Sequence, residues 1–183
     1  SGSLTTEQLI EQLKKQDDVL YAEPNYEIHA LDIDDPYYSK QWSMASTNVE
    51  YEWDDKGVTG TDAIVAVVDT GVDYTHEELS GNMWENTHYP KLRGECGFDF
   101  RKADEDPMDE NGHGTHCAGI IGAKGNNGVG ISGVNRDVRI MACRILDEYG
   151  SGYNAEEVAA YNYINKALDL GEPIKAINNS WGG

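Results

Sequence analysis

The stretch AIVAVVD, residues 63–69, is a nearly unbroken apolar run that ends on a carboxylate. Such a run is typical of a strand whose two faces are both covered, because a strand with one wet face would alternate apolar and polar residues. Thr70 and Gly71 follow directly and end the strand. The segment therefore predicts a buried parallel strand with Asp69 at its carboxyl end.

Further along the chain, apolar runs alternate with helical patterns. The sequence predicts strands at residues 97–100, 138–146 and 174–183, the last of them running into a loop. It also predicts a helix rich in small residues at 116–125 and a helix with apolar residues at helical spacing at 154–171. This alternation implies an α/β fold in which helices cover both faces of a parallel sheet.

The first segment of the chain has a different pattern. Residues 5–16 predict a short amphipathic helix with a threonine cap, and residues 18–31 alternate well enough for a strand. Residues 32–42 are expected to form an extended connector. We place a boundary between two segments near residues 30–35, so that residues 1–33 form a small αβ unit and 34–183 the α/β unit.

The overall charge is strongly negative, with 33 acidic residues against 14 basic ones and a net charge of −19. Such a field repels phosphate backbones and anionic lipid, so we expect neither a nucleic-acid partner nor a membrane-surface partner. No apolar run reaches the roughly 18 residues of a transmembrane helix. The 183 residues are enough for one domain with a core of its own.

The three cysteines, Cys96, Cys117 and Cys143, are an odd number and lack the paired spacing of a metal site. This argues against a disulfide framework. We interpret all three as small apolar residues of the interior.

The stretch ENGHGTHCAG, residues 110–119, places two histidines three positions apart among glycines. A metal site would need further spaced ligands, and the segment lacks the glutamate that a zinc hydrolase carries between its histidines. If the helix begins near His113, its positive end favours the neutral imidazole, which can accept a proton. We therefore interpret His113 as a base and His116 as a buried, hydrogen-bonded helix residue.

These motifs resemble those of a known family, the subtilisin-like serine endopeptidases or subtilases. The family's three signatures are similar, in order, to VAVVDTGVDYTHEEL (65–79), NGHGTHCAG (111–119) and INNSWGG (177–183). The phrases most similar to its thermitase-like branch are DPYYSKQW (35–42), GNNGVGI (125–131) and RILDEYGSG (144–152). The resemblance implies a subtilisin-like three-layer fold and an Asp-His-Ser triad. In that triad His113 would move the proton, and Asp69 would hold the imidazole tautomer and stabilise its positive form.

The same resemblance implies two substrate-binding edges. One would be Gly150, Ser151 and Gly152, and the other Ser180, Trp181 and Gly182. Main-chain hydrogen bonds from such edges hold an extended polypeptide substrate, and neighbouring pockets select its side chains.

The nucleophilic serine and the oxyanion-hole asparagine of the family have no matching motif in this chain. We therefore expect residues 34–183 to be the N-terminal half of a subtilisin-like catalytic domain, incomplete by itself. Activity would need a complementary protease chain that carries the serine. A shortened fragment and a non-catalytic peptide-binding or regulatory module on the same scaffold are the alternatives. An aspartic protease is disfavoured, because it needs two DTG turns and residues 69–71 are one.

Residues 1–33 resemble the closing half of the inhibitory prosegment that precedes subtilase domains. The helix at 5–16 and the stretch LYAEPNYEIHAL, residues 20–31, carry this resemblance. It implies a secreted enzyme, although this chain carries no signal-peptide pattern.

The loop GNNGVGISGV, residues 125–134, resembles the family's tight calcium site. By position, the resemblance implies Ca²⁺ ligands from the side chains of Asp35, Glu78 and Asn127 and from the carbonyls of Val129 and Ile131. Glu78 stands where the family usually has aspartate.

A second calcium loop is suggested by DFRKADEDPMDENG, residues 99–112, which resembles one of the thermitase-like branch. Its ligands would be Asp99, Asp104, Asp106 and the Met108 carbonyl. Lys102 replaces a carboxylate of that branch, and a solvated acidic loop without a cation is the alternative.

Overall fold

The computed structural model describes residues 4–16, 18–22, 33–54 and 56–182, and the chain divides into two units, residues 1–32 and 33–183. The first unit contains helix α1 (Thr6–Leu13), where Thr5 and Gln8 form a reciprocal capping box. The predicted helix is therefore present but shorter than 5–16. Most of the strand predicted at 18–31 lies outside the described residues, and its identity as a prosegment stays a prediction.

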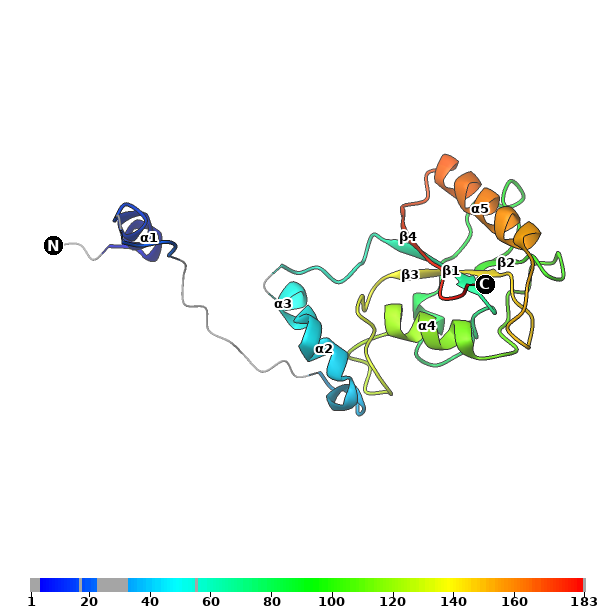
Figure 1. The fold of residues 1–183 in the computed structure, drawn as a ribbon, viewed down its shortest axis with the longest axis horizontal. Helices are drawn as coiled ribbons and strands as arrows, with labels where there is room; N and C mark the ends of the chain where they lie inside the picture. Colours follow the sequence, from blue (N-terminus) through cyan, green and yellow to red (C-terminus); the bar gives the residue numbers. More distant parts are fainter. Residues whose placement is uncertain (1–3, 17, 23–32, 55, 183) are drawn as a thin grey trace. The chain divides into compact units, whose positions relative to one another are not determined.

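The second unit is built on a four-stranded parallel sheet in the order β2-β3-β1-β4 (Figure 1). The strands are β1 (Ile64–Asp69), β2 (Gly97–Asp99), β3 (Arg139–Arg144) and β4 (Ile174–Asn178). Every residue of β1 is buried, as the apolar run predicts. The predicted parallel sheet is confirmed.

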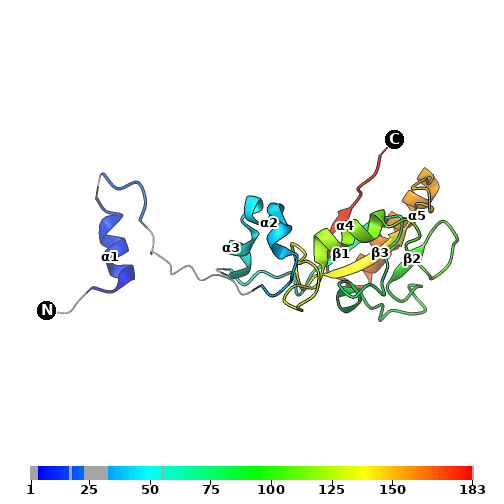
Figure 2. The same cartoon turned by 90° about the horizontal axis from the view of Figure 1, so that it is seen from below.

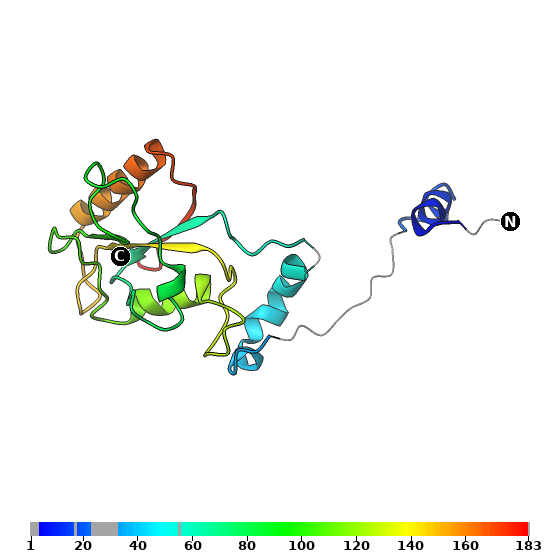
Figure 3. The same ribbon diagram turned by 180° about the vertical axis from the view of Figure 1, so that it is seen from behind.

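Helices α4 (His113–Gly122) and α5 (Asn154–Asp169) cover opposite faces of this sheet (Figures 1 and 3). Alternate strand residues supply two cores, because successive side chains point to opposite faces. The core under α5 includes Ile64, Ala66, Val68, Met141, Ala160, Ile164 and Ala167. The core under α4 includes Val65, Val67, Ile140, Ala142 and Ala118. The three-layer α/β/α architecture is therefore confirmed.

Two short helices were not predicted: α2 (Trp42–Thr47) and α3 (Val49–Asp54), which lie side by side in Figure 2. A 3₁₀ turn at Tyr38–Lys40 precedes them, so the extended connector predicted at 32–42 is wrong over its last residues. Trp53 is buried, and its indole nitrogen donates to the Val134 carbonyl at 2.8 Å. Helices this short depend on such tertiary contacts rather than on their own propensity.

The boundaries of α4 also differ from the prediction of 116–125. The helix begins at His113 because Gly112, at φ +102°, makes a left-handed turn that a side chain would oppose. It ends at Gly122, where Ala123 turns to an extended conformation. His113 is thus the first residue of the helix.

No helix in the described part of the chain combines the length and the apolar character needed to cross a membrane.

Replacing Ile140 tests the packing of the sheet against α4. Its side chain is fully buried on β3, so Ile140→Ala should lower the free energy of unfolding by about 2–5 kcal/mol. Urea unfolding followed by circular dichroism measures this change. Ile120→Ala is the matched control, because Ile120 is 47% exposed on α4 and its loss should cost under about 1 kcal/mol. Equal losses in the two variants would contradict the assigned core.

Candidate active site

Three charged side chains end neighbouring strands on the α4 side of the sheet. Asp69 on β1 is in register with Arg144 on β3, and Arg144 is in register with Asp99 on β2. All three are buried, at 0%, 1% and 0% exposure. Burying a charge costs free energy unless the charge is paired or hydrogen-bonded. Three buried charges at the carboxyl ends of parallel strands therefore mark this edge of the sheet as a candidate site.

Asp69 and His113 form a hydrogen-bonded pair. His113 Nδ1 lies 2.8 Å from Asp69 Oδ1, which also accepts the Thr70 backbone N–H at 2.7 Å. The imidazole is 47% exposed while the carboxylate is fully covered. Asp69 Oδ2 has no hydrogen-bond partner in the described part of the chain.

This geometry suits proton transfer. With the Nδ1 hydrogen held by Asp69, the neutral imidazole keeps Nε2 as its acceptor, on a ring that solvent and ligands can reach. Asp69 is positioned to stabilise the imidazolium that forms once Nε2 takes a proton. The pair therefore has the geometry of a general base with an orienting carboxylate.

The helix approaches the end of β1 so closely that only glycine fits at position 114. A Cβ at this position would clash with the Gly71 carbonyl oxygen. The Gly114 N–H instead donates to Thr70 Oγ1 at 2.9 Å. This contact brings the first turn of α4, and with it His113, onto Asp69.

Asp109 is the acceptor that shapes the turn before α4. Its carboxylate accepts hydrogen bonds from Thr70 Oγ1, from the N–H groups of Asn111, Gly112 and Thr115, and from Thr115 Oγ1, at 2.6–3.0 Å. Partial burial acts to raise the pKa of Asp109, but hydrogen bonds from Gly112, Thr115 and Asn111 outweigh it and lower the pKa below its ordinary value. The sequence analysis did not identify Asp109 and Thr70 as residues of the site. The available signal was their position in the chain, since Thr70 directly follows Asp69 and Asp109 precedes His113 in the same short segment.

The two predicted substrate edges meet at one pocket of about 510 Å³. Its lining includes Gly150, Ser151 and Gly152 from one edge and Trp181 and Gly182 from the other. The Trp181 indole nitrogen donates to the Val68 carbonyl at 2.7 Å, which ties its edge to β1.

The other walls of this pocket are apolar, polar and acidic side chains, and Ser180 is not among the lining residues. The remaining lining residues are Ile145, Leu146, Tyr153, Asn154 and Glu157. The Ser180 hydroxyl exchanges hydrogen bonds with the Asn178 side chain at 3.0 and 3.1 Å.

The interpretation of His116 as a buried, hydrogen-bonded residue is wrong. Its side chain is exposed, because it projects from the outer side of α4, where it lines a pocket of about 320 Å³ with His76.

The cysteines are only partly as predicted. Cys143 is buried, while Cys96 and Cys117 are half-buried, and all three are free. Burial raises the pKa of each thiol, which disfavours the reactive thiolate. In the described residues, three His, Cys, Asp or Glu ligand atoms lie within 4.8 Å of one another only where Cys117 meets Asp69 and His113, the pair already described.

The donor set of the predicted first calcium loop is compatible with a cation. Asp35 and Glu78 are both only 4% exposed, and no lysine or arginine of the described chain pairs with either. Asp35 accepts the N–H groups of Asn126 and Asn127, and Glu78 accepts that of Ile131. Buried carboxylates without a cationic partner are the ligands that Ca²⁺ prefers.

The other expected ligands of this loop lie beside the two carboxylates. The Asn127 amide contacts Glu78 at 3.1 Å through its nitrogen, and its oxygen accepts the Val129 N–H at 2.9 Å. The carbonyls of Val129 and Ile131 accept no hydrogen bond from the described part of the chain.

The predicted second calcium loop does not assemble a cation site. Asp99 accepts the N–H groups of Arg101 and Lys102, while Asp104 and Asp106 each accept an N–H two residues further on. The Met108 carbonyl accepts a hydrogen bond from Arg144. Arg144 pairs with Asp99 at 3.5 Å and takes the Met108 carbonyl, so a cation of the protein already occupies this donor set and it does not fit Ca²⁺.

Comparison with known proteins identifies relatives over most of the chain. The model of the subtilase family matches residues 60–183. The thermophilic serine proteinase of Bacillus sp. (strain AK1) is 41% identical over 179 residues, covering 96% of this chain and 40% of that protein. Thermitase of Thermoactinomyces vulgaris is 40% identical over 150 residues, covering 81% of this chain and 47% of thermitase.

A solved structure is also similar. The crystal structure of a cold-adapted subtilisin-like serine proteinase matches with a TM-score of 0.53 and 34% identity, covering 68% of this chain and 38% of that one. The chain therefore spans two fifths to a half of the length of these relatives.

Replacing Asp109 should make stability less dependent on pH. Because its folded-state pKa is lowered, Asp109 stabilises the fold above the ordinary carboxyl pKa of about 3.9, and this contribution is lost as pH falls through the lower folded value. Asp109→Asn should cost about 1–3 kcal/mol near neutral pH, with a deficit that shrinks below about pH 4.

Urea unfolding from pH 7 to pH 3 measures this effect. Asp62→Asn is the matched control, since Asp62 is exposed and makes no side-chain hydrogen bond in the described chain. A deficit that stays constant over the whole range would count against the role of the Asp109 carboxylate.

Proposed function

Because this chain belongs to the subtilase family, we propose that it supplies the aspartate and histidine of an Asp-His-Ser triad for peptide-bond hydrolysis. The observation that carries the proposal is the 2.8 Å hydrogen bond between buried Asp69 and exposed His113. His113 Nε2 takes the proton of the serine hydroxyl while the serine oxygen attacks the scissile carbonyl. The same nitrogen then gives that proton to the leaving amine, while Asp69 stabilises the imidazolium between the two steps.

The serine is proposed to come from a complementary protease chain. In the described residues no hydroxyl group hydrogen-bonds to the His113 imidazole, and Ser180 is engaged with Asn178. Strand β4 pairs only with β1 among the described strands and leaves Lys175, Ala176 and Ile177 exposed. An uncovered edge strand with apolar residues favours a covering partner, which would complete both the sheet and the triad.

The substrate is proposed to be an extended polypeptide that lies between Gly150–Gly152 and Ser180–Gly182. The shared pocket of about 510 Å³ supports this, since it has room for one large side chain beside the substrate backbone. Glycines on both edges let the substrate backbone approach closely.

A second candidate function is a non-catalytic peptide-binding or regulatory module. It is favoured by the same pocket, which residues between 145 and 182 of this chain form by themselves. The labelling experiment below separates the two functions.

Calcium is proposed as a structural ion at the first loop only, held by Asp35, Glu78, Asn127 and the carbonyls of Val129 and Ile131. Its charge would offset two buried carboxylates and hold the loop that follows α4. We also propose that the protein is secreted, since a relative from Bacillus subtilis that is 33% identical over 156 residues is named a minor extracellular protease.

Fluorophosphonate labelling of the purified protein, with every chain that copurifies, tests the triad. We expect the label on a serine outside residues 1–183, since a triad serine attacks the probe. His113→Ala should abolish labelling, and Asp69→Asn should slow it by about 10⁴-fold.

Ser180→Ala is the control, and it should label like the wild type. A label on Ser180 would contradict the complementary chain. No label with every chain present would leave the peptide-binding module as the function.

Chelation tests the calcium site. Removing Ca²⁺ with EDTA should lower the midpoint of thermal unfolding of the wild type, because an ion at about 100 times its Kd stabilises the fold by about 2.7 kcal/mol. Glu78→Gln should remove most of this response. Glu77→Gln, a change at the exposed neighbouring residue, should retain it. A wild type that responds no more than Glu78→Gln would exclude the site.

A further inference from the structure

Arg144 is a buried cation at the centre of the sheet edge that carries the proposed active site. Its side chain is 1% exposed and lies between the strand ends of Asp69 and Asp99. Burying a guanidinium costs free energy unless its N–H groups are hydrogen-bonded and its charge is paired. The partners of Arg144 are therefore informative about its role.

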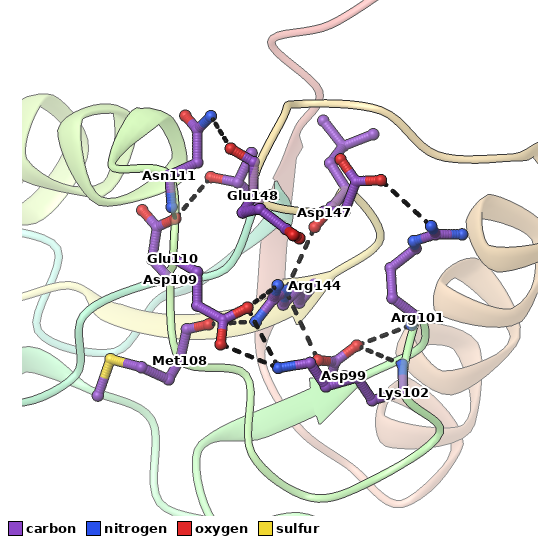
Figure 4. A network of polar contacts seen from close by, with 12 residues as sticks. Asp99, Arg101, Lys102, Met108, Asp109, Glu110, Asn111, Arg144, Asp147 and Glu148 are labelled. Carbon is purple, nitrogen blue, oxygen red and sulfur yellow. Dashed lines mark hydrogen bonds and ion pairs between the residues drawn. The ribbon is translucent and has the colours of Figure 1, made fainter.

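Two of these partners lie in the segment that leads to His113. Arg144 Nη1 donates to the Met108 carbonyl at 2.8 Å, and Nη2 donates to Glu110 Oε2 at 2.6 Å (Figure 4). The hydrogen bond from Arg144 is the main reason that the pKa of Glu110 lies below its ordinary value. Asp109, between these two residues, binds Thr70 and the first turn of α4 instead. The segment is thus held by Arg144 on one side and by Thr70 on the other.

A third partner lies at the start of the substrate edge. Arg144 Nε donates to the Leu146 carbonyl at 3.2 Å, two residues further along the chain. A second hydrogen bond joins the same two segments, since Asn111 Nδ2 donates to the Glu148 carbonyl at 2.9 Å (Figure 4). One guanidinium therefore contacts both the segment before His113 and the segment before Gly150.

Asp99 completes the surroundings of the guanidinium. Its Oδ2 lies 3.5 Å from Arg144 Nε and has no hydrogen bond in the described chain, while Oδ1 accepts two backbone N–H groups. The pair is an ion pair rather than a hydrogen bond. The hydrogen bonds of Arg144 go to the segment before His113 and to the segment before Gly150. Asp99 contributes a negative charge that pairs with the guanidinium.

We propose that Arg144 is a positioning residue that sets the alignment of His113 relative to the substrate edge without touching the substrate. This inference rests on the proposed function of the same site. An arginine suits the role because its planar fork donates in several fixed directions at once, whereas a lysine is a single flexible point charge. Small misalignments matter, since a displacement of about 1 Å can cost about 10²-fold in rate.

The test uses the full protein with its complementary chain and compares Arg144→Lys, Glu110→Gln and Arg101→Lys. Arg101 is the matched control: its side chain pairs with Asp147 and Glu156 but makes no hydrogen bond or ion pair with residues 108–113. Glu110→Gln is the second variant in case Arg144→Lys does not fold. Its side chain is 46% exposed, so the change weakens the contact with Arg144 without burying an unpaired charge.

The measurements are kcat and KM for a peptide substrate and the low-field NMR signal of the His113 Nδ1 proton. We expect Arg144→Lys and Glu110→Gln to lower kcat by about 10-fold or more, with KM changed by less than about 3-fold. The proton signal should shift or broaden in both variants. Arg101→Lys should retain the wild-type kcat and proton signal.

Two results would overturn the inference. One is a wild-type kcat and an unchanged His113 signal in both variants. The other is a kcat loss in Arg101→Lys as large as in Arg144→Lys, which would mean general destabilisation. If the assembled protein hydrolyses no peptide, the proposed function fails, and the His113 signal alone still decides the role of Arg144.

Discussion

The burial of the Asp69 carboxylate is the constraint on which the rest of the second unit depends. A carboxylate at 0% exposure needs hydrogen bonds, and Asp69 obtains them from its neighbour Thr70 and from His113. Reaching His113 requires α4 to lie against the end of β1, which in turn requires glycine at position 114. Strand β1, helix α4 and Gly114 together make the contact between Asp69 and His113 possible. The His113 imidazole stays 47% exposed in this contact.

Several acidic side chains of the second unit accept hydrogen bonds from backbone N–H groups. Asp109 gathers the N–H groups of the turn before α4, and Asp35 and Glu78 gather those of the loop after it. Carboxylates in such places stabilise irregular backbone, because each N–H that leaves water needs an acceptor. Arg144 lies between the two strand-end carboxylates, Asp69 and Asp99, and its positive charge offsets part of their negative charge.

Much of the fold and part of the candidate site could be predicted from the sequence. The run at 63–69 determines a buried strand, and the helical spacing at 154–171 determines α5, because burial periodicity is a local property of the chain. The motifs around Asp69 and His113 also pointed to the edge where the structure brings these two residues together. The short helices α2 and α3 could not be predicted, since their stability comes from contacts such as that of Trp53 with Val134.

What only the tertiary structure decided is which side chains share an environment. The sequence does not state that Arg144 contacts Met108 and Glu110, that Asp109 contacts Thr70, or that His116 faces outward. It also does not state that Arg144 takes the carbonyl that a second calcium would need. Periodicity assigns a residue to a strand or a helix, but contacts between residues about 35 positions apart depend on how strands and helices pack. That packing brings Arg144 together with Asp99 and Glu110 at the sheet edge, and no single segment contains this information.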